Sequence, residues 1–520
     1  MKSLIFILGF LAGYTWADDP CYQIKFNQSS FVCACNATYC DTYGRVQDLI
    51  KPESVLVVTS DKDSQRLDVQ YADFTTNEDS TRIQFILDET QMYQEILGFG
   101  GAFTDSAAFN MYDMDAETMG KILASYFDPS GLDYTIGRVN MGGCDFSTRT
   151  YTYVDTPGDV ALETFELQEE DYLKIALIKQ ANTFRPQNTS LKMYASPWTA
   201  PPWMKSNNDY AGQGYLLPEY YQAWADYFVK FLNFYKEEDI SFWGLTAQNE
   251  PWDGLVPNFT FNAMAWNATS QRVWITDNLG PSLEAAGYAD LKVMVLDDQR
   301  PMVPKWAREV FSDPRALKYV SGIGVHWYVD EVFPVPFALD QAHEEFPDKF
   351  LLYTEACTGD RPWELEKVML GDWNRGERYI NNIIEDLNHW VVGWTDWNLV
   401  LDRQGGPNWA GNFVDAPIIV DPSKGEFYKQ PMYFAMAHIS RFITPGSVRI
   451  QLSHTDTAIQ AVAVLRPDST VAVVLLNKNS TERKVTLRTS RGDLNLDLGP
   501  RSFTSVAFSM TQVPSIHILH

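Results

Sequence analysis

The feature that most constrains this chain is a repeated alternation of short apolar strands with longer helix-like stretches. Eight strands can be read, each ending in polar or aromatic residues: Ile96–Phe103, Leu132–Met141, Leu191–Ser196, Phe242–Ala247, Leu291–Leu296, Val320–Tyr328, Lys349–Thr354 and Val391–Trp397. Strands that alternate with helices form a parallel sheet covered by helices, and eight such units over about 300 residues have the size of a (β/α)8 barrel. The sequence therefore predicts an α/β fold built on a TIM barrel.

One of the intervening helices is marked by its aromatic residues. Tyr221, Trp224, Phe228, Phe231 and Tyr235 recur at steps of three and four residues. This spacing places all five on one face of a helix. We interpret the stripe as core packing and not as a binding surface.

The residues outside the barrel predict a second, all-β part. The runs Ala461–Leu465, Thr470–Leu476, Lys484–Leu487 and Ser502–Phe508 are rich in β-branched residues and separated by turns. The segment Ser54–Phe85 also resembles strands, and we expect it to join the same β-sandwich. The predicted organisation is a signal peptide (1–17), a disulfide-rich N-terminal segment (18–45), sandwich strands (46–92), the barrel (93–446), the rest of the sandwich (447–512) and a tail (513–520).

The start of the chain predicts entry into the secretory pathway. Lys2 precedes the apolar run Leu4–Ala12, and Thr15-Trp16-Ala17 has the small-x-small pattern of a cleavage site. The run is about half of the roughly 20 apolar residues that a membrane span needs. Six Asn-x-Ser/Thr sequons fit a glycosylated lumenal product: Asn27, Asn36, Asn188, Asn258, Asn267 and Asn479.

The six cysteines divide into a cluster (Cys21, Cys33, Cys35 and Cys40) and two distant residues (Cys144 and Cys357). In an oxidising lumen the cluster predicts two disulfides in a segment with little core of its own. Three pairings are open, of which Cys21–Cys33 with Cys35–Cys40 is favoured. A zinc site is disfavoured because no histidine lies among these cysteines. The two distant cysteines have no nearby basic residue in the sequence, so we expect buried free thiols.

The net charge of −26 argues against a nucleic acid or another anionic partner held by bulk charge. It fits a protein of an acidic compartment, where protonation of carboxylates reduces self-repulsion. An acidic protein that works at neutral pH fits equally well.

Two glutamates stand at predicted strand ends, Glu250 after the fourth strand and Glu355 after the seventh. The carboxyl ends of barrel strands meet at one mouth, so the two side chains should converge. Hydrolysis of a glycosidic bond needs one carboxylic acid for the leaving oxygen and one carboxylate at the anomeric carbon. Either glutamate alone would be interpreted as a solvated loop charge.

A larger set of motifs surrounds the two glutamates. Asn249-Glu250-Pro251 is followed 105 residues later by Thr354-Glu355-Ala356-Cys357. The flanking segments are Arg149–Pro157, Ala195–Thr199, Leu296–Arg300, Val325–Tyr328, Val392–Asn398 and Phe413–Asp415. Together they resemble the acid β-glucosidases of glycoside hydrolase family 30 over nearly the whole mature chain. The resemblance implies a retaining hydrolase with Glu250 as acid/base and Glu355 as nucleophile, their carboxyls about 5–5.5 Å apart.

The resemblance also implies roles for other residues. Those that match positions holding the hydroxyls of glucose are Asp145, Trp198, Asn249, Trp397 and Asn412. Arg138 and Tyr328 match residues beside the nucleophile, and His326 matches one beside the acid/base, where a purely structural role is an equal alternative. No cofactor and no metal are expected. We expect Arg138 and Tyr328 to keep Glu355 ionised, and a low-dielectric environment to raise the pKa of Glu250.

For the substrate, the resemblance implies hydrolysis of glucosylceramide in sphingolipid catabolism, in the lysosome or after secretion. It also implies help from a saposin-type activator and anionic lipid, with association at the membrane surface. Alternatives are the same chemistry on sterol glucosides, other β-glucosides or polysaccharides, and a catalytically silent glycan- or lipid-binding protein. The sequence departs from the family at Gln248, at Trp252-Asp253 and in Val256–Trp266, so the preferred aglycone is the open question.

Overall fold

The computed structural model describes residues 19–76, 79–187, 189–454 and 456–510. The predicted signal peptide (1–17), the Asn188 sequon and the predicted tail (513–520) lie outside this part of the chain. No helix in the described ranges combines the length and the apolar character that crossing a membrane would require.

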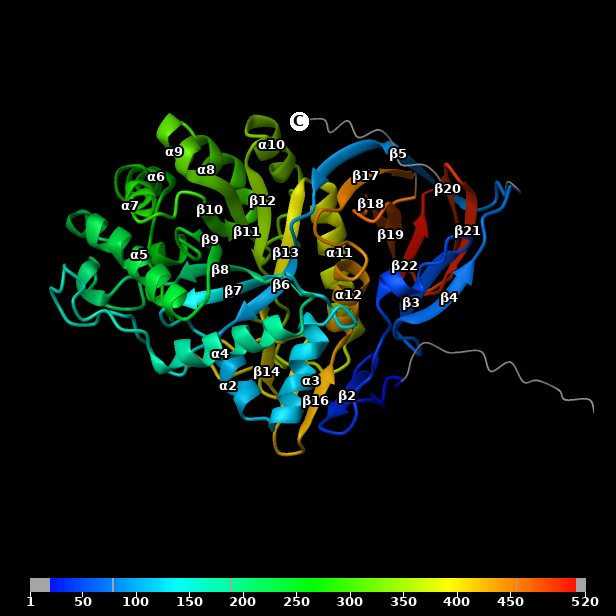
Figure 1. Cartoon of the computed structure of the whole chain (residues 1–520), viewed down its shortest axis with the longest axis horizontal. Coiled ribbons are helices and arrows are strands. Elements are labelled where there is room, and N and C mark those ends of the chain that lie inside the picture. Colours follow the sequence, from blue (N-terminus) through cyan, green and yellow to red (C-terminus); the bar gives the residue numbers. More distant parts are fainter. Residues whose placement is uncertain (1–18, 77–78, 188, 455, 511–520) are drawn as a thin grey trace, which may run out of the picture.

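The centre of the molecule is a closed barrel of eight parallel strands (Figure 1), in the order β10-β11-β12-β13-β6-β7-β8-β9. The strands are β6 (Gly98–Phe103), β7 (Ile136–Met141), β8 (Lys192–Pro197), β9 (Phe242–Thr246), β10 (Lys292–Gln299), β11 (Val320–His326), β12 (Phe350–Glu355) and β13 (Val391–Asn398). The eight predicted strands and the barrel are confirmed. Strands such as β6 and β7 are buried along their whole length, as expected where helices cover the outer face of a sheet.

Helices cover the outside of the barrel (Figure 1). They are α2 (Asp105–Tyr112), α3 (Ala116–Phe127), α4 (Glu169–Thr183), α5 (Tyr221–Glu237), α6 (Ala268–Trp274), α7 (Gly280–Ala285), α8 (Val303–Val310), α9 (Pro314–Tyr319), α10 (Phe337–Glu345), α11 (Trp373–Asn388) and α12 (Pro431–Ser440). The aromatic stripe lies on α5, where four of its five residues are buried and Tyr221 is half-buried. Its interpretation as core packing is confirmed.

Beside the barrel lies a β-sandwich with its own apolar core. Its nine strands run in the order β21-β20-β5-β17-β18-β19-β22-β3-β4. They are β3 (Val55–Asp61), β4 (Asp68–Ala72), β5 (Ile83–Glu95), β17 (Val448–His454), β18 (Ile459–Leu465), β19 (Thr470–Asn477), β20 (Arg483–Thr489), β21 (Gly492–Leu498) and β22 (Ser502–Ser509). Strands before the barrel thus pair with strands after it, for example β3 with β22. The predicted runs omit β17 and β21, in which polar residues alternate with apolar ones because one face of each strand is less buried.

A third, smaller sheet carries the N-terminal segment. Strands β1 (Gln23–Ile24) and β2 (Val32–Asn36) join β14 (Val400–Asp402), β15 (Ile418–Asp421) and β16 (Glu426–Lys429). Two disulfides, Cys21–Cys33 and Cys35–Cys40, hold this segment in the pairing favoured from the sequence. The short helix α1 (Val46–Leu49) leads from it into the sandwich. Cys144 and Cys357 are buried free thiols, as expected.

The sequons in the described chain differ in accessibility. Asn27, Asn258 and Asn267 are exposed, whereas Asn36 and Asn479 are half-buried. The Nδ2 atom of Asn479, to which a glycan would attach, donates to Ala458 O at 3.2 Å and to Asn477 Oδ1 at 2.8 Å. A glycan there would replace one of these hydrogen bonds, so the exposed sequons are the better acceptors.

Candidate active site

Glu250 is placed by a strained turn after β9. Its backbone has a φ of 39°, a left-handed conformation that costs a non-glycine residue on the order of 1–3 kcal/mol and is concentrated at functional sites. The Glu250 amide donates to the carbonyl oxygen of Asp297 at 2.9 Å. Asp297 itself lies in a bulge of β10, where the register with β11 shifts between Leu296 and Asp298. These two irregular backbones place the Glu250 carboxyl group on the wall of the barrel mouth and the Asp297 carboxyl group in the interior below it.

Glu355 is the last residue of β12, which lies three strands from β9 around the barrel. Its Oε1 accepts a hydrogen bond from the hydroxyl of Tyr328 at 2.7 Å. Its Oε2 accepts from Nη1 of Arg138. Both donors favour the ionised carboxylate. The structure therefore places Arg138 and Tyr328 beside Glu355.

The two glutamates face each other across His326. The Nδ1 atom of His326 lies 3.0 Å from Glu250 Oε1 and 3.9 Å from Glu355 Oε1. One oxygen of each carboxyl group and a nitrogen of His326 all lie within 4.8 Å of one another. Inverting glycosidases separate their carboxyls by about 6.5–9.5 Å and retaining ones by about 5–5.5 Å. The closest oxygens of the two carboxyl groups therefore lie nearer to each other than the carboxyl groups of inverting enzymes do.

Beneath Glu250 and Glu355, a buried network of ion pairs and hydrogen bonds around Asp297 holds the neighbouring side chains in place. Asp297 accepts from Arg138 Nη2 at 3.0 Å, from Thr246 at 2.6 Å and from Thr354 at 2.5 Å. The Nε2 atom of His326 lies 3.1 Å from Asp297 Oδ1. Both ring nitrogens of His326 thus face carboxylates, which raises its pKa to about 10 despite burial and keeps the imidazole charged. The alternative of a purely structural His326 is weakened by its contact with Glu250.

The pKa values of Glu250 and Glu355 in the site without substrate differ from those expected from the sequence. Burial alone would raise the pKa of Glu250, but hydrogen bonding to charged His326 brings it below its ordinary value. For Glu355, burial and the neighbouring Glu250 outweigh His326 and Arg138 and raise the pKa. The expected order was wrong because the sequence did not show that the imidazolium would contact Glu250 more closely than Glu355.

A cavity of about 700 Å³ opens above the two glutamates. Its wall contains seven of the sequence-predicted residues: Asp145, Trp198, Glu250, Tyr328, Glu355, Trp397 and Asn412. The rings of Trp198 and Trp397 are stacked 5.2 Å apart. Asn412 Nδ2 donates to Asp145 Oδ2 at 3.0 Å, and burial raises the pKa of Asp145 to about 7. Paired aromatic rings beside a carboxyl and an amide provide both apolar contact and hydrogen bonds for a sugar ring.

The other three predicted residues lie behind this wall. Arg138, Asn249 and His326 are buried, and Asn249 Oδ1 accepts from Arg138 Nη2 at 2.8 Å. In this structure the Asn249 oxygen is therefore engaged with Arg138.

Several residues around Glu250 had no assigned role in the site, although Trp252-Asp253 and Val256–Trp266 were marked as the segments on which the aglycone preference depends. Gln299 Nε2 donates to Glu250 Oε1 at 3.0 Å. Trp252, Asp253, Phe259 and Phe261 line the cavity, and the side chains of Asp253 and Glu250 are hydrogen-bonded. The spacing of Asp253, three residues after Glu250, was the available signal, since a turn brings such positions together.

Two groups of side chains in the described ranges are close enough to be considered as metal ligands. Cys35, Cys40 and Asp41 form one, but its sulfur atoms are joined in a disulfide. Glu250, His326 and Glu355 form the other, but both nitrogens of His326 already face carboxylates. A protonated imidazole has no lone pair for a metal, so neither donor set suits one.

Comparison with known proteins extends over most of the chain. Residues 96–443 match the glycosyl hydrolase family 30 TIM-barrel domain, and residues 446–506 match the family 30 β-sandwich domain. The chain is 42% identical to mouse (Mus musculus) lysosomal acid glucosylceramidase, with 93% of this chain and 94% of the relative covered. It is 41% identical to putative glucosylceramidase 4 of Caenorhabditis elegans, with coverages of 91% and 92%. The solved structure of the endo-β1,6-glucanase BT3312 superimposes with a TM-score of 0.78 at 28% identity, covering 88% of this chain and all of that one.

Proposed function

The chain belongs to glycoside hydrolase family 30 and is a glycoside hydrolase, and from this we propose that it is a retaining β-glucosidase that converts glucosylceramide to glucose and ceramide. Glu250 is the acid/base and Glu355 the nucleophile. The observation that carries the proposal is the closeness of the two carboxyl groups, of which one oxygen each lies within 4.8 Å of the other, whereas inverting enzymes separate their carboxyl groups by about 6.5–9.5 Å.

In the first step, an oxygen of Glu355 bonds to the anomeric carbon while the bond from that carbon to the aglycone oxygen breaks. Glu250 gives its proton to the departing oxygen, so ceramide leaves as an alcohol. In the second step, Glu250 takes a proton from water, the water oxygen bonds to the anomeric carbon, and Glu355 is released as a carboxylate. Two inversions return the β configuration.

In the free site the pKa of Glu250 is lowered and that of Glu355 is raised, so the reaction requires the bound substrate to favour a proton on Glu250. A glycosidic oxygen beside Glu250 is a hydrogen-bond acceptor and favours the protonated form of that carboxyl. Arg138 and Tyr328 meanwhile donate to Glu355 and favour its ionised form. Substrate binding thus supports the reactive proton distribution although the pKa order of the free site is the reverse.

The roles of the glutamates can be tested by chemical rescue with azide. In Glu355→Gly no covalent intermediate forms, so azide should attack directly and give α-glucosyl azide. In Glu250→Ala the intermediate forms from a substrate with a good leaving group, so azide should give β-glucosyl azide. The opposite assignment of products, or full activity of either variant on glucosylceramide, would overturn the proposal.

The substrate is supported by the two glucosylceramidase relatives and by the shape of the mouth. Exposed apolar side chains lie on the cavity wall or close to it in sequence: Trp252, Val332, Phe333, Trp363 and Leu365, the last 96% exposed. We propose that this apolar rim rests on a membrane surface and receives the lipid. The help of a saposin-type activator and anionic lipid, and a lysosomal or secretory location, are proposed from the relatives alone.

The contribution of the apolar rim to activity can be separated from that of the catalytic residues by comparing two substrates. Phe333→Ser with Leu365→Ser should lower hydrolysis of glucosylceramide in vesicles but not of a soluble aryl β-glucoside, because neither residue lines the cavity. Leu317→Ser, on α9 and 41% exposed, is the matched control. Equal losses on both substrates would argue against membrane docking through this rim.

A second candidate is the same reaction on a glucan, favoured by the likeness to an endo-β1,6-glucanase structure. The comparison of glucosylceramide with β-1,6-linked glucan and a sterol glucoside at pH 5 distinguishes the candidates. Retention of both glutamates with their hydrogen-bond donors argues against a silent binding protein.

A further inference from the structure

Arg361 lies on the wall of the active-site cavity, in the loop between β12 and α11 (residues 356–372). Only 11% of its side chain is exposed. Its Nη1 donates a hydrogen bond to the backbone carbonyl of Tyr328 at 2.7 Å, and its Nη2 donates to Glu331 Oε2 at 2.9 Å. Both acceptors belong to the loop after β11, so Arg361 joins the two loops at the barrel mouth.

Tyr328 connects this contact to the proposed nucleophile. Its hydroxyl donates to Glu355 Oε1 at 2.7 Å, and its carbonyl oxygen accepts from Arg361. Tyr328 lies in a turn two residues beyond the end of β11, where the ladder to β12 has already ended. Among the described residues, Arg361 is the one that donates to the Tyr328 carbonyl. A displacement of this peptide would therefore carry the hydroxyl away from Glu355.

A cluster of opposite charges holds Arg361 in place. Arg378 of α11 donates from Nη1 to Asp360 Oδ1 at 2.6 Å, and its Nε lies 3.4 Å from Glu331 Oε2. The Arg378 guanidinium also packs over Trp327, 4.1 Å from the centre of the ring. Two arginines and two carboxylates balance in charge, and together they fix both the backbone before Arg361 and the acceptor of its second nitrogen.

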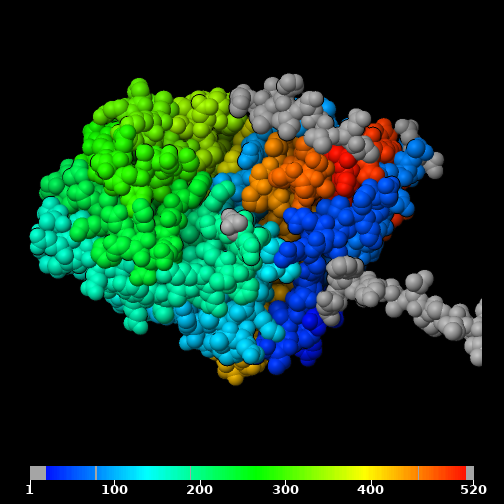
Figure 2. Space-filling model, viewed as in Figure 1, coloured from blue at the N-terminus to red at the C-terminus, as the bar shows by residue number. Residues whose placement is uncertain are grey.

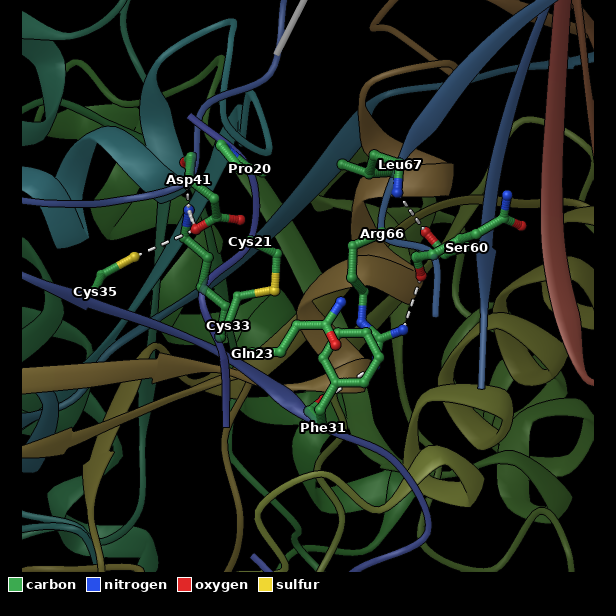
Figure 3. Close-up of a disulfide and its surroundings, with 12 residues drawn as sticks. Pro20, Cys21, Gln23, Phe31, Cys33, Cys35, Asp41, Ser60, Arg66 and Leu67 are labelled. Carbon is green, nitrogen blue, oxygen red and sulfur yellow. Dashed lines mark hydrogen bonds and ion pairs between the residues drawn. A yellow bond between two sulfur atoms is a disulfide. The ribbon is translucent and has the colours of Figure 1, made fainter. Parts of the chain in front are cut away.

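The far end of the loop after β12 is anchored by the N-terminal segment. The Ser30 amide donates to the Gly371 carbonyl at 2.8 Å. Arg66 Nη2 in turn donates to the Phe31 carbonyl at 3.0 Å, and Figure 3 shows these two residues in the surroundings of the Cys21–Cys33 disulfide. In the space-filling view the N-terminal segment and the β3–β4 region form one continuous blue surface beside the barrel (Figure 2). The loop is thus tied down at both ends, at β12 and at this segment.

We propose that Arg361 is a positioning residue for the nucleophile, an inference that rests on the proposed roles of Glu250 and Glu355. Arg361 acts through Tyr328, by holding its peptide where the hydroxyl meets Glu355 Oε1. A hydrogen bond weakens steeply as its angle and length depart from the optimum. Catalytic groups likewise lose rate when a supporting residue lets them shift.

The test is the pH profile of Arg361→Met on a soluble aryl β-glucoside. Methionine keeps an unbranched apolar side chain and removes the donors. Without a well-placed Tyr328 hydroxyl the pKa of Glu355 rises, so the acid limb of kcat/KM should move to higher pH. We expect kcat/KM at the optimum to fall about 2- to 10-fold. Arg361→Lys, which retains a donor on a stem of similar length, should lie closer to the wild type.

A double-mutant cycle shows whether Arg361 acts through Tyr328. In Tyr328→Phe the hydroxyl is already absent, so adding Arg361→Met should move the acid limb no further and should cost less than it does in the wild type. Arg308→Met is the matched control, because it removes an exposed arginine paired with Glu345 on the outside of the barrel. It should keep the wild-type profile.

An unmoved acid limb in Arg361→Met, losses that multiply in the double variant, or an equal shift in Arg308→Met would overturn the proposal. The urea midpoint of each variant is measured alongside, since a purely structural role would lower activity at all pH values alike. Should Arg361→Met fail to fold, Arg361→Gln takes its place with the same expected shift, because its shorter side chain cannot reach both acceptors.

Failure of this proposal can be told from failure of the proposed function. The roles of Glu250 and Glu355 are decided by the configuration of the azide products, whereas the role of Arg361 is decided by the acid limb. Azide products as expected, with an unmoved acid limb in Arg361→Met, would refute Arg361 alone. Azide products of the opposite configuration would refute the function on which it rests.

Discussion

The Asp253 amide donates to the Glu250 carbonyl at 3.0 Å, in a turn that brings the two carboxyl groups close enough for each to shift the pKa of the other. Two carboxyls can share a hydrogen bond only if one of them is protonated. Burial and the neighbouring Glu250 raise the pKa of Asp253 well above its ordinary value, so Asp253 holds that proton. Its hydrogen bond in turn lowers the pKa of Glu250. The proposed acid/base, Glu250, therefore has a second, protonated carboxyl group beside it, that of Asp253.

Replacing Asp253 should move the pH profile of the enzyme. In Asp253→Ala the donor is lost, the pKa of Glu250 rises, and Glu250 keeps its proton to higher pH. The alkaline limb of kcat/KM should therefore shift upward, whereas Asp253→Asn, which still donates, should shift it less. An alkaline limb that stays in place in Asp253→Ala would show that the contact does not tune Glu250. The measurement is kcat/KM on a soluble aryl β-glucoside between pH 4 and about 8.

Removing the Tyr328 hydroxyl should weaken the nucleophile. A hydrogen bond to a charged acceptor is worth about 1.5–3 kcal/mol, so Tyr328→Phe should lower kcat/KM by about 10- to 100-fold. Without this donor the pKa of Glu355 rises, so the acid limb should also move to higher pH. Tyr112→Phe, an exposed tyrosine on α2, is the control and should match the wild type. A normal acid limb in Tyr328→Phe would contradict the role.

Neutralising Asp297 should destabilise the protein more than neutralising a surface acid. Arg138 and His326 both lie against Asp297 in the barrel interior, and breaking a buried pair costs about 3–5 kcal/mol. Asp297→Asn should lower the urea midpoint accordingly, while Asp277→Asn, which breaks a half-exposed pair with Arg315, should change stability by about 0.5 kcal/mol or less. Similar midpoints for the two variants would show that Asp297 is not the centre of the network.

The buried Asp145 should make the folded protein more stable in acid. Its pKa rises from 3.8 to about 7, mainly through burial, so the folded state binds a proton that the unfolded state releases between these values. Stability from this group therefore falls as pH rises from about 4 to 7. Asp145→Asn should reduce the decline in Tm from pH 5 to pH 7, and the exposed Asp290→Asn should retain it. Parallel declines in the two variants would contradict the prediction.

The barrel could be predicted because its strands are short, apolar and separated by helical periodicity, a local signal. Strands β17 and β21 could not be predicted from the sequence because their alternating polar residues are also typical of loops. Only in the folded protein does a neighbouring strand cover their apolar side. The pairing of β3 with β22 joins residues more than 400 positions apart, and it was foreseen only as a shared sandwich without an order of strands.

The active site likewise contains residues that could be predicted from the sequence and residues that could not. Glu250 and Glu355 could be found because both end a predicted strand within familiar motifs. The contacts of Asp297 could not be predicted, since its position in a bulge of β10, between Arg138 and His326, depends on how separate strands of the barrel are aligned. Gln299 and Asp253 both lie in segments that the sequence had marked, but their contacts with Glu250 could not be predicted, because they depend on the turn after β9 and on the end of β10.

The sequence by itself determined which secondary structures form and which carboxyl groups reach the barrel mouth, because hydrophobic periodicity and strand ends are local properties of the chain. Only the tertiary structure decided the charges of those groups. The pKa of a buried carboxyl depends on which donors and cations lie within a few ångströms, and these come from distant strands. The position of His326 beside Glu250 is a consequence of packing that no stretch of sequence contains.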